Sequence, residues 1–62
     1  MCLGTTGVVT VIRDDDGIPM AEVDAGPAGE IKACLLTCPE AAAGDTVLVH
    51  SGYVLQILKE EE

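Results

Sequence analysis

Two side chains that can bind a transition metal lie near opposite ends of this sequence. Cys2 belongs to the opening stretch MCLGTTG, and His50, the only histidine, follows an apolar run at 47–49. A thiolate and an imidazole together form a donor set suited to a transition metal. Structural zinc usually needs four protein ligands. The pair therefore favours a metal that already carries other ligands or that is shared with a partner protein.

His50 also has a simpler interpretation. Strand parity places it on the same face as Leu48, where a lone histidine is half-buried and makes one hydrogen bond. No carboxylate or serine stands at a spacing that indicates a catalytic triad, and no acid–base pair is evident. The sequence therefore does not predict an enzyme.

The stretch CLLTC contains the two other cysteines, Cys34 and Cys38. On a strand they would lie about 13 Å apart, whereas the α-carbons of a disulfide are roughly 4.4–6.8 Å apart. We therefore expect two small, half-buried side chains. On a helix the same spacing would bring both thiols to one face, and a zinc site formed by Cys2, Cys34, Cys38 and His50 is the alternative.

The acidic stretch DDDG at 14–17 resembles half of a calcium-binding loop. If Asp14 is the first position of such a loop, Ala25 occupies the twelfth, where a bidentate glutamate is needed. The stretch is better explained as the solvated tip of a hairpin.

Charge and composition exclude several classes of partner. Eleven acidic residues against three basic ones give a net charge of −8, and Tyr53 is the only aromatic residue. Nucleic-acid binding needs clustered lysine and arginine residues, or aromatic side chains on which nucleobases stack. We therefore expect no nucleic acid as a partner. Anionic membrane surfaces are disfavoured for the same reason, and no apolar run reaches the roughly 20 residues of a membrane helix.

The length of 62 residues predicts one small domain over 1–62, with a frayed acidic tail at 60–62. No basic segment followed by an apolar one begins the chain, so we expect no secretory signal and a cytoplasmic location.

Short β-rich segments separated by turns must position these residues. Strands are predicted where β-branched or alternating apolar residues occur, and a short helical turn is predicted where proline precedes three alanines. The strands are expected at 7–13, 18–24, 29–37, 46–50 and 53–59, and the helical turn at 39–45. Closing the sheet protects its edges. The fold class is therefore all-β: a small OB-fold-like barrel of about five strands with at most one short helical turn.

The sequence resembles the HypC/HupF family of NiFe-hydrogenase maturation chaperones at both ends. The opening MCLG and the later stretch GDTVLVHSGYVLQIL carry the resemblance. The chain has Thr5 and Thr6 where the family usually has an apolar residue and a proline.

The resemblance implies a scaffold and carrier. With a HypD-like partner, such a protein holds iron that carries cyanide and carbon monoxide, the Fe(CN)2CO unit, and delivers it to the hydrogenase large-subunit precursor. Cys2 and His50 fall on the family's metal-contacting positions, and Cys2, Leu3, Gly4 and His50 on its partner-binding surface. The alternatives are a β-barrel interaction module with no metal role and the small zinc-binding domain described above.

Overall fold

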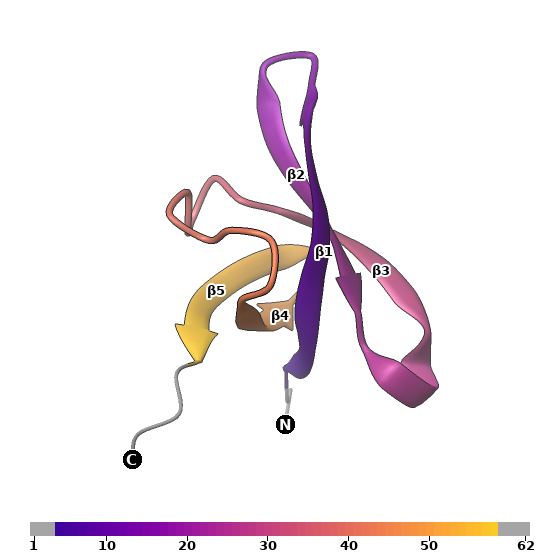
Figure 1. Cartoon of the computed structure of the whole chain (residues 1–62). Helices are drawn as coiled ribbons and strands as arrows, with labels where there is room; N and C mark the ends of the chain where they lie inside the picture. Colours follow the sequence, from indigo (N-terminus) through magenta and orange to yellow (C-terminus); the bar gives the residue numbers. More distant parts are fainter. Residues whose placement is uncertain (1–3, 59–62) are drawn as a thin grey trace.

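The computed structural model describes residues 4–58, which form a closed all-β barrel of five strands (Figure 1). The elements are β1 (Thr5–Asp15), β2 (Ile18–Asp24), the 3-10 helix η1 (Gly26–Ala28), β3 (Glu30–Cys34), β4 (Thr46–His50) and β5 (Tyr53–Leu58). Around the barrel the strand order is β1-β2-β3-β5-β4. This confirms the predicted OB-fold-like architecture.

The longest strand, β1, belongs to two antiparallel ladders and so closes the barrel. Its residues 5–8 pair with β4, from Thr5–Val49 to Val8–Thr46. Its residues 8–15 pair with β2, with a register shift between Val9 and Val11. A bulge of this kind bends a strand and increases its twist. The other closure is weaker, because β3 and β5 run parallel and share the single pair Cys34–Tyr53.

Valine and alanine fill the barrel. Alternation along β2 buries Ala21 and Val23 completely and leaves Asp24 exposed, as predicted. The largest fully buried side chains are Leu35, Val9, Val23, Val47 and Val54. A barrel this narrow needs short branched side chains to fill it, which accounts for a core without aromatic residues.

The connection between β3 and β4 differs from the prediction. The strand expected at 29–37 ends at Cys34, because Leu35 donates its N–H to Pro19 and the chain then turns, with Cys38 donating back to Leu35. Leu35 and Cys38 are thereby buried in the core. The two cysteines therefore do not share one straight strand, which was the basis of the predicted spacing of about 13 Å. Both side chains are buried more deeply than the predicted half-burial, and both thiols are free.

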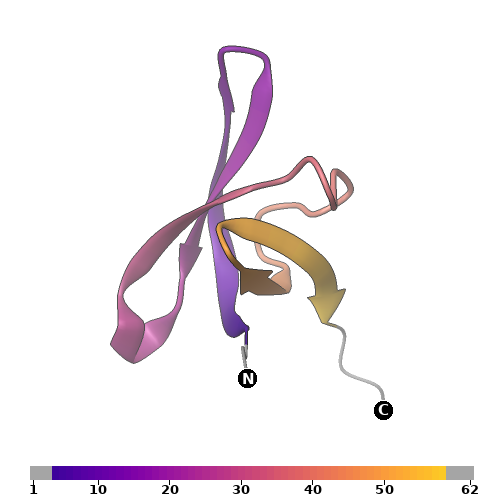
Figure 2. The same cartoon turned by 180° about the vertical axis from the view of Figure 1, so that it is seen from behind.

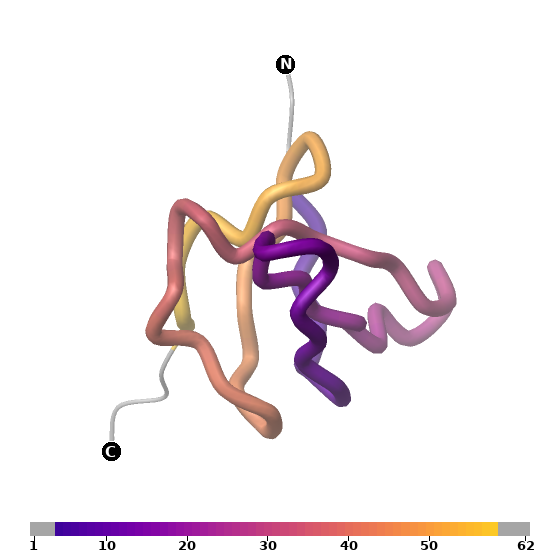
Figure 3. Tube along the Cα trace, turned by 90° about the horizontal axis from the view of Figure 1, so that it is seen from above, coloured from indigo at the N-terminus to yellow at the C-terminus, as the bar shows by residue number. Residues whose placement is uncertain are grey.

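The helical turn expected at 39–45 was also misplaced. That segment consists of turns, one of them held by Ala42, which donates to the Asp45 carboxylate at 2.9 Å. The one helical turn among residues 4–58 is η1, which has Pro27 in its first turn. Seen from above, the segment at 35–45 passes outside the strands before β4 begins (Figure 3).

Two strand boundaries moved outward. The strand expected at 7–13 runs from Thr5 to Asp15, because both ends find partners, Val49 at one end and Ile18 at the other. Only Asp16 and Gly17 form the turn, with φ of 59° and 88°. The strand expected at 53–59 is observed to Leu58, and residue 59 lies outside the described residues.

Gly7 stands where β1 leaves β2, and no larger residue fits there. A Cβ atom at this position would lie 2.5 Å from Val23 Cγ1 and 2.6 Å from the Asp24 carbonyl oxygen. We expect Gly7→Ala to lower the free energy of unfolding by about 1–3 kcal/mol, the usual cost of overpacking. Urea denaturation measures it. The neighbouring Thr6→Ala, at an exposed position, should change it by less than about 0.5 kcal/mol, and equal losses would contradict the steric explanation.

Candidate functional site

His50 is the last residue of β4 and is half-buried, on the same face as the half-buried Leu48, whereas Val47 and Val49 are in the core. Its Nδ1 lies 3.2 Å from the hydroxyl of Ser51. The predicted half-buried histidine with one hydrogen bond is therefore confirmed. When Nδ1 carries the ring proton and donates a hydrogen bond to the Ser51 hydroxyl, Nε2 keeps its lone pair and is the nitrogen able to bind a metal.

A tight turn fixes the direction of His50. Ser51 and Gly52 both have positive φ, 56° and 82°, and His50 pairs with Tyr53 across them. Such two-residue turns match the twist of a hairpin. The Gly52 carbonyl accepts a hydrogen bond from the Cys34 N–H at 2.8 Å. The turn is therefore anchored to β3 as well as to its own hairpin.

Gly4, the first described residue, lies against β4. A Cβ atom on Gly4 would lie 2.5 Å from Leu48 Cδ1 and 3.0 Å from the Val49 carbonyl oxygen. Because Thr5 pairs with Val49 in an antiparallel ladder, the register continues from Gly4 towards His50. Of the predicted site residues, Gly4 and His50 thus both lie at the C-terminal end of β4.

Cys2 and Leu3 lie outside the described residues, so their predicted roles are untested by the structure. Ser51 was missed by the sequence analysis. Its position directly after the only histidine was the one available signal, because a hydroxyl one residue away can reach the imidazole when the backbone turns.

The other metal candidates are not assembled within residues 4–58. No group of three or more histidine, cysteine, aspartate or glutamate side chains there could hold a metal ion. Cys34 and Cys38 are buried free thiols, and the Cys34 sulfur accepts a bond from the Leu36 N–H at 3.5 Å. Asp14 and Asp15 are exposed near the end of the β1–β2 hairpin, as the predicted hairpin tip requires.

Comparison with known protein families decides the assignment. The HupF/HypC family matches residues 1–62, the whole chain. The chain belongs to the HupF/HypC family. Neither curated proteins nor solved structures give a match.

Membership of the HupF/HypC family makes this chain a hydrogenase maturation chaperone, one of a group that acts with other maturation proteins rather than as a catalyst. No helix within residues 4–58 is long and apolar enough to cross a membrane. The stretches that carried the resemblance, MCLG and GDTVLVHSGYVLQIL, supply the first described residue of the barrel and the β4–β5 hairpin. In this HupF/HypC chain Gly4, the described residue of the first stretch, therefore lies against the β4–β5 hairpin.

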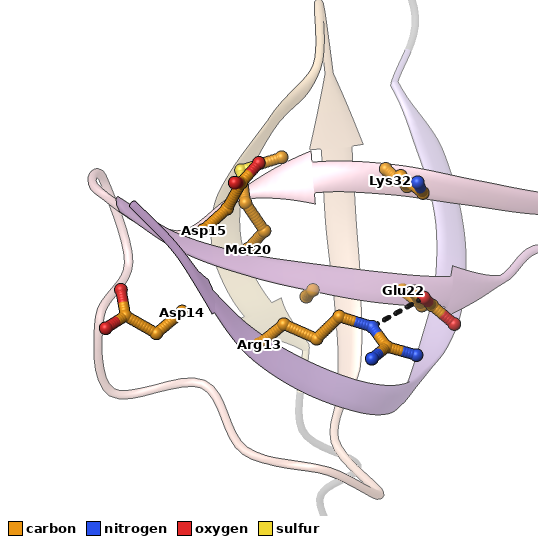
Figure 4. A pocket seen from close by; sticks show the side chains of 7 residues that line it. Arg13, Asp14, Asp15, Met20, Glu22 and Lys32 are labelled. Carbon is orange, nitrogen blue, oxygen red and sulfur yellow. Dashed lines mark hydrogen bonds and ion pairs between the residues drawn. The ribbon is translucent and has the colours of Figure 1, made fainter. Parts of the chain in front are cut away.

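A concave region of this HupF/HypC barrel lies on the outer face of β1, β2 and β3 (Figure 4). Arg13 and Glu22 form an ion pair across it, with Arg13 Nε 2.9 Å from the carboxylate. The lining also includes Met20 and Lys32. Arg13 is mostly exposed, so its ion pair contributes little to stability.

Gly4 is the residue whose replacement tests how this HupF/HypC chain positions its N-terminal arm. We expect Gly4→Ala to push residue 4 away from the Val49 carbonyl and to change the NMR shifts of the His50 ring. The matched variant Thr6→Ala, two positions along the chain from Gly4, should leave the His50 ring shifts unchanged. Equal shifts in both variants, or none in either, would contradict a close approach specific to Gly4.

Burial raises the pKa of the Cys38 thiol, and the nearby Glu40 carboxylate raises it further. A folded pKa above the unfolded value of roughly 8.5 means that the thiol's contribution to stability is complete below that pH. It is lost as pH rises through the folded pKa. We expect the urea midpoint of the natural protein to fall more steeply above about pH 8.5 than that of Cys38→Ala, because the folded-state pKa of the thiol is raised. Parallel pH profiles would show that the thiol does not titrate with unfolding.

Proposed function

We propose that this chain holds the Fe(CN)2CO unit together with a HypD-like partner in the cytoplasm and delivers it to the NiFe-hydrogenase large-subunit precursor. The family match over the whole chain supports the general role. The observation that supports the specific proposal is that Gly4 lies against β4. Thr5 pairs with Val49, so one further step along the same ladder leads from Gly4 to His50.

Chain length supports a shared site. Cys2 precedes Gly4 by two residues, and two residues of chain span at most about 7 Å. The length of the arm therefore permits a Cys2 thiolate and the His50 ring to contact one iron centre. Iron that arrives with two cyanides and one carbon monoxide needs few protein ligands, which matches a two-donor site better than bare zinc does.

Each residue then has a distinct role. Cys2 is the thiolate that contacts the iron and the precursor, and removal of Met1 would give it a free α-amine whose positive charge lowers the thiol pKa. His50 is the second ligand or the group that orients the cargo. Ser51, within hydrogen-bonding distance of Nδ1, leaves Nε2 for this task. Leu3 and Gly4 contribute to the surface that meets the partner.

The test is infrared spectroscopy of the chain co-expressed with its HypD-like partner and purified without oxygen. We expect metal-bound cyanide and carbon monoxide stretching bands in the natural complex. Cys2→Ala should abolish them and His50→Ala should reduce them severalfold or abolish them, because each variant removes one donor. Co-purification of the partner is scored on the same samples.

Cys38→Ala is the matched control, because it removes a cysteine that is buried in the core rather than placed at the site. It should keep the bands. Bands that persist in Cys2→Ala, or bands absent from a well-folded natural complex, would overturn the proposal. Tightly bound zinc near one equivalent per chain would instead establish the zinc-binding alternative.

A further inference from the structure

The β1–β2 hairpin is longer than the barrel that carries it. Pairing of β1 with β4 stops at Val8–Thr46, and the segment before β4 adds two backbone bonds, both to Val9. Pairing with β2 continues to Asp15–Ile18. The hairpin therefore projects beyond the other strands (Figures 1 and 2). Residues 11–15 of β1, on the side away from β2, form a segment that we name the free edge.

The free edge presents backbone groups that no residue between 4 and 58 pairs with. The two-residue turn makes Asp15–Ile18 the closing pair, in which both residues direct their N–H and C=O groups at each other. Successive residues of an antiparallel strand alternate in direction, so the N–H and C=O groups of Ile12 and Asp14 point away from β2. Before Val11 the register shift between Val9 and Val11 reverses the alternation, so the N–H and C=O of Val9 also point away from β2, where they bond to Asp45 and Gly44.

The side chains along the free edge form an apolar part and an acidic part, separated by Arg13, whose guanidinium is paired with Glu22. Val11 is 37% exposed and Ile12 is 41% exposed. Asp14 and Asp15 follow, both exposed, and no ion pair involves either of them within the described residues. Exposed strand edges with apolar side chains are normally covered or blocked. This edge is neither covered nor blocked by proline or lysine.

We propose that the free edge binds an extended segment of a partner protein as an added strand, a segment with apolar residues beside Val11 and Ile12 and lysine or arginine beside Asp14 and Asp15. Main-chain hydrogen bonds from Ile12 and Asp14 give the affinity in this mode of recognition, and the alternating side chains give the selectivity. The net charge of −8 steers a basic segment towards the site.

A second copy of this chain is a poor occupant. Pairing two free edges in antiparallel fashion would place Asp14 of each copy opposite Ile12 of the other, so neither acidic residue would gain a basic partner. Each chain also has a net charge of −8, so two copies repel one another. The acidic residues of the free edge thus favour a basic partner over a second copy. The proposal does not depend on the iron-carrying role, because the free edge uses neither Cys2 nor His50.

The experiment titrates the 15N-labelled full chain with an end-capped peptide of sequence KVTVTVK, observed by NMR. We expect shift changes at residues 11–15 and slower hydrogen exchange of the Ile12 and Asp14 amides, while the already paired Arg13 amide is little affected. The same peptide with its central amides N-methylated keeps the charge but cannot pair, so it should bind at least tenfold more weakly.

Two kinds of variant separate pairing from charge. Ile12→Pro removes the outward N–H and should weaken binding at least tenfold; the fold tolerates the substitution because a proline is allowed on an edge strand. Ile12→Ala keeps the N–H, and its binding should stay within about threefold of the natural chain. The double variant Asp14→Asn with Asp15→Asn should weaken binding about three- to tenfold through two exposed charge pairs. Equal binding by the methylated peptide, unchanged exchange at Ile12 and Asp14, or a dimer formed through this edge would overturn the proposal.

Discussion

The whole structure depends on β1 pairing with two different strands. Without the β1–β4 ladder the chain would be a curled sheet with open edges. Without the β1–β2 ladder it would lose its longest hairpin. The change of partner occurs within one residue, Val8, which pairs on both sides. A chain of 62 residues buries a smaller fraction of its surface than a larger domain does. Closing the barrel with one shared strand therefore saves residues that a sixth strand would need.

The two glycines of the opening stretch have separate tasks in this arrangement. Gly7 lets β1 pass close to the end of β2, and Gly4 lets the start of the chain lie against Leu48 and Val49. Two residues thus separate Gly7, at the crossing that closes the barrel, from Gly4, which lies against β4. The spacing in GTTG couples the fold to the candidate site, since a change in the crossing at Gly7 would also move Gly4.

The sequence predicted most of the barrel because its signals were local. Alternation defined β2 completely, and the Asp–Gly and Ser–Gly turns marked both tight hairpins. Prediction failed where long-range contacts decided the outcome. Cys34 ends β3 because Leu35 bonds to Pro19, sixteen positions earlier in the chain, and no local pattern announces that bond. At the site, the apolar run before His50 predicted its burial, whereas the meeting of Gly4 with β4 required the pairing of strands far apart in the sequence.

Tyr53 gives this barrel an optical property that follows from its place in the ladder. It is the only aromatic residue, there being no tryptophan and no phenylalanine, and it pairs with His50 across the turn while 44% of its surface is exposed. The near-ultraviolet absorption and the intrinsic fluorescence of the chain therefore originate almost entirely beside the candidate site. The protein carries a single natural chromophore at the edge where its cargo and partner would arrive, and the rest of the molecule is silent at those wavelengths.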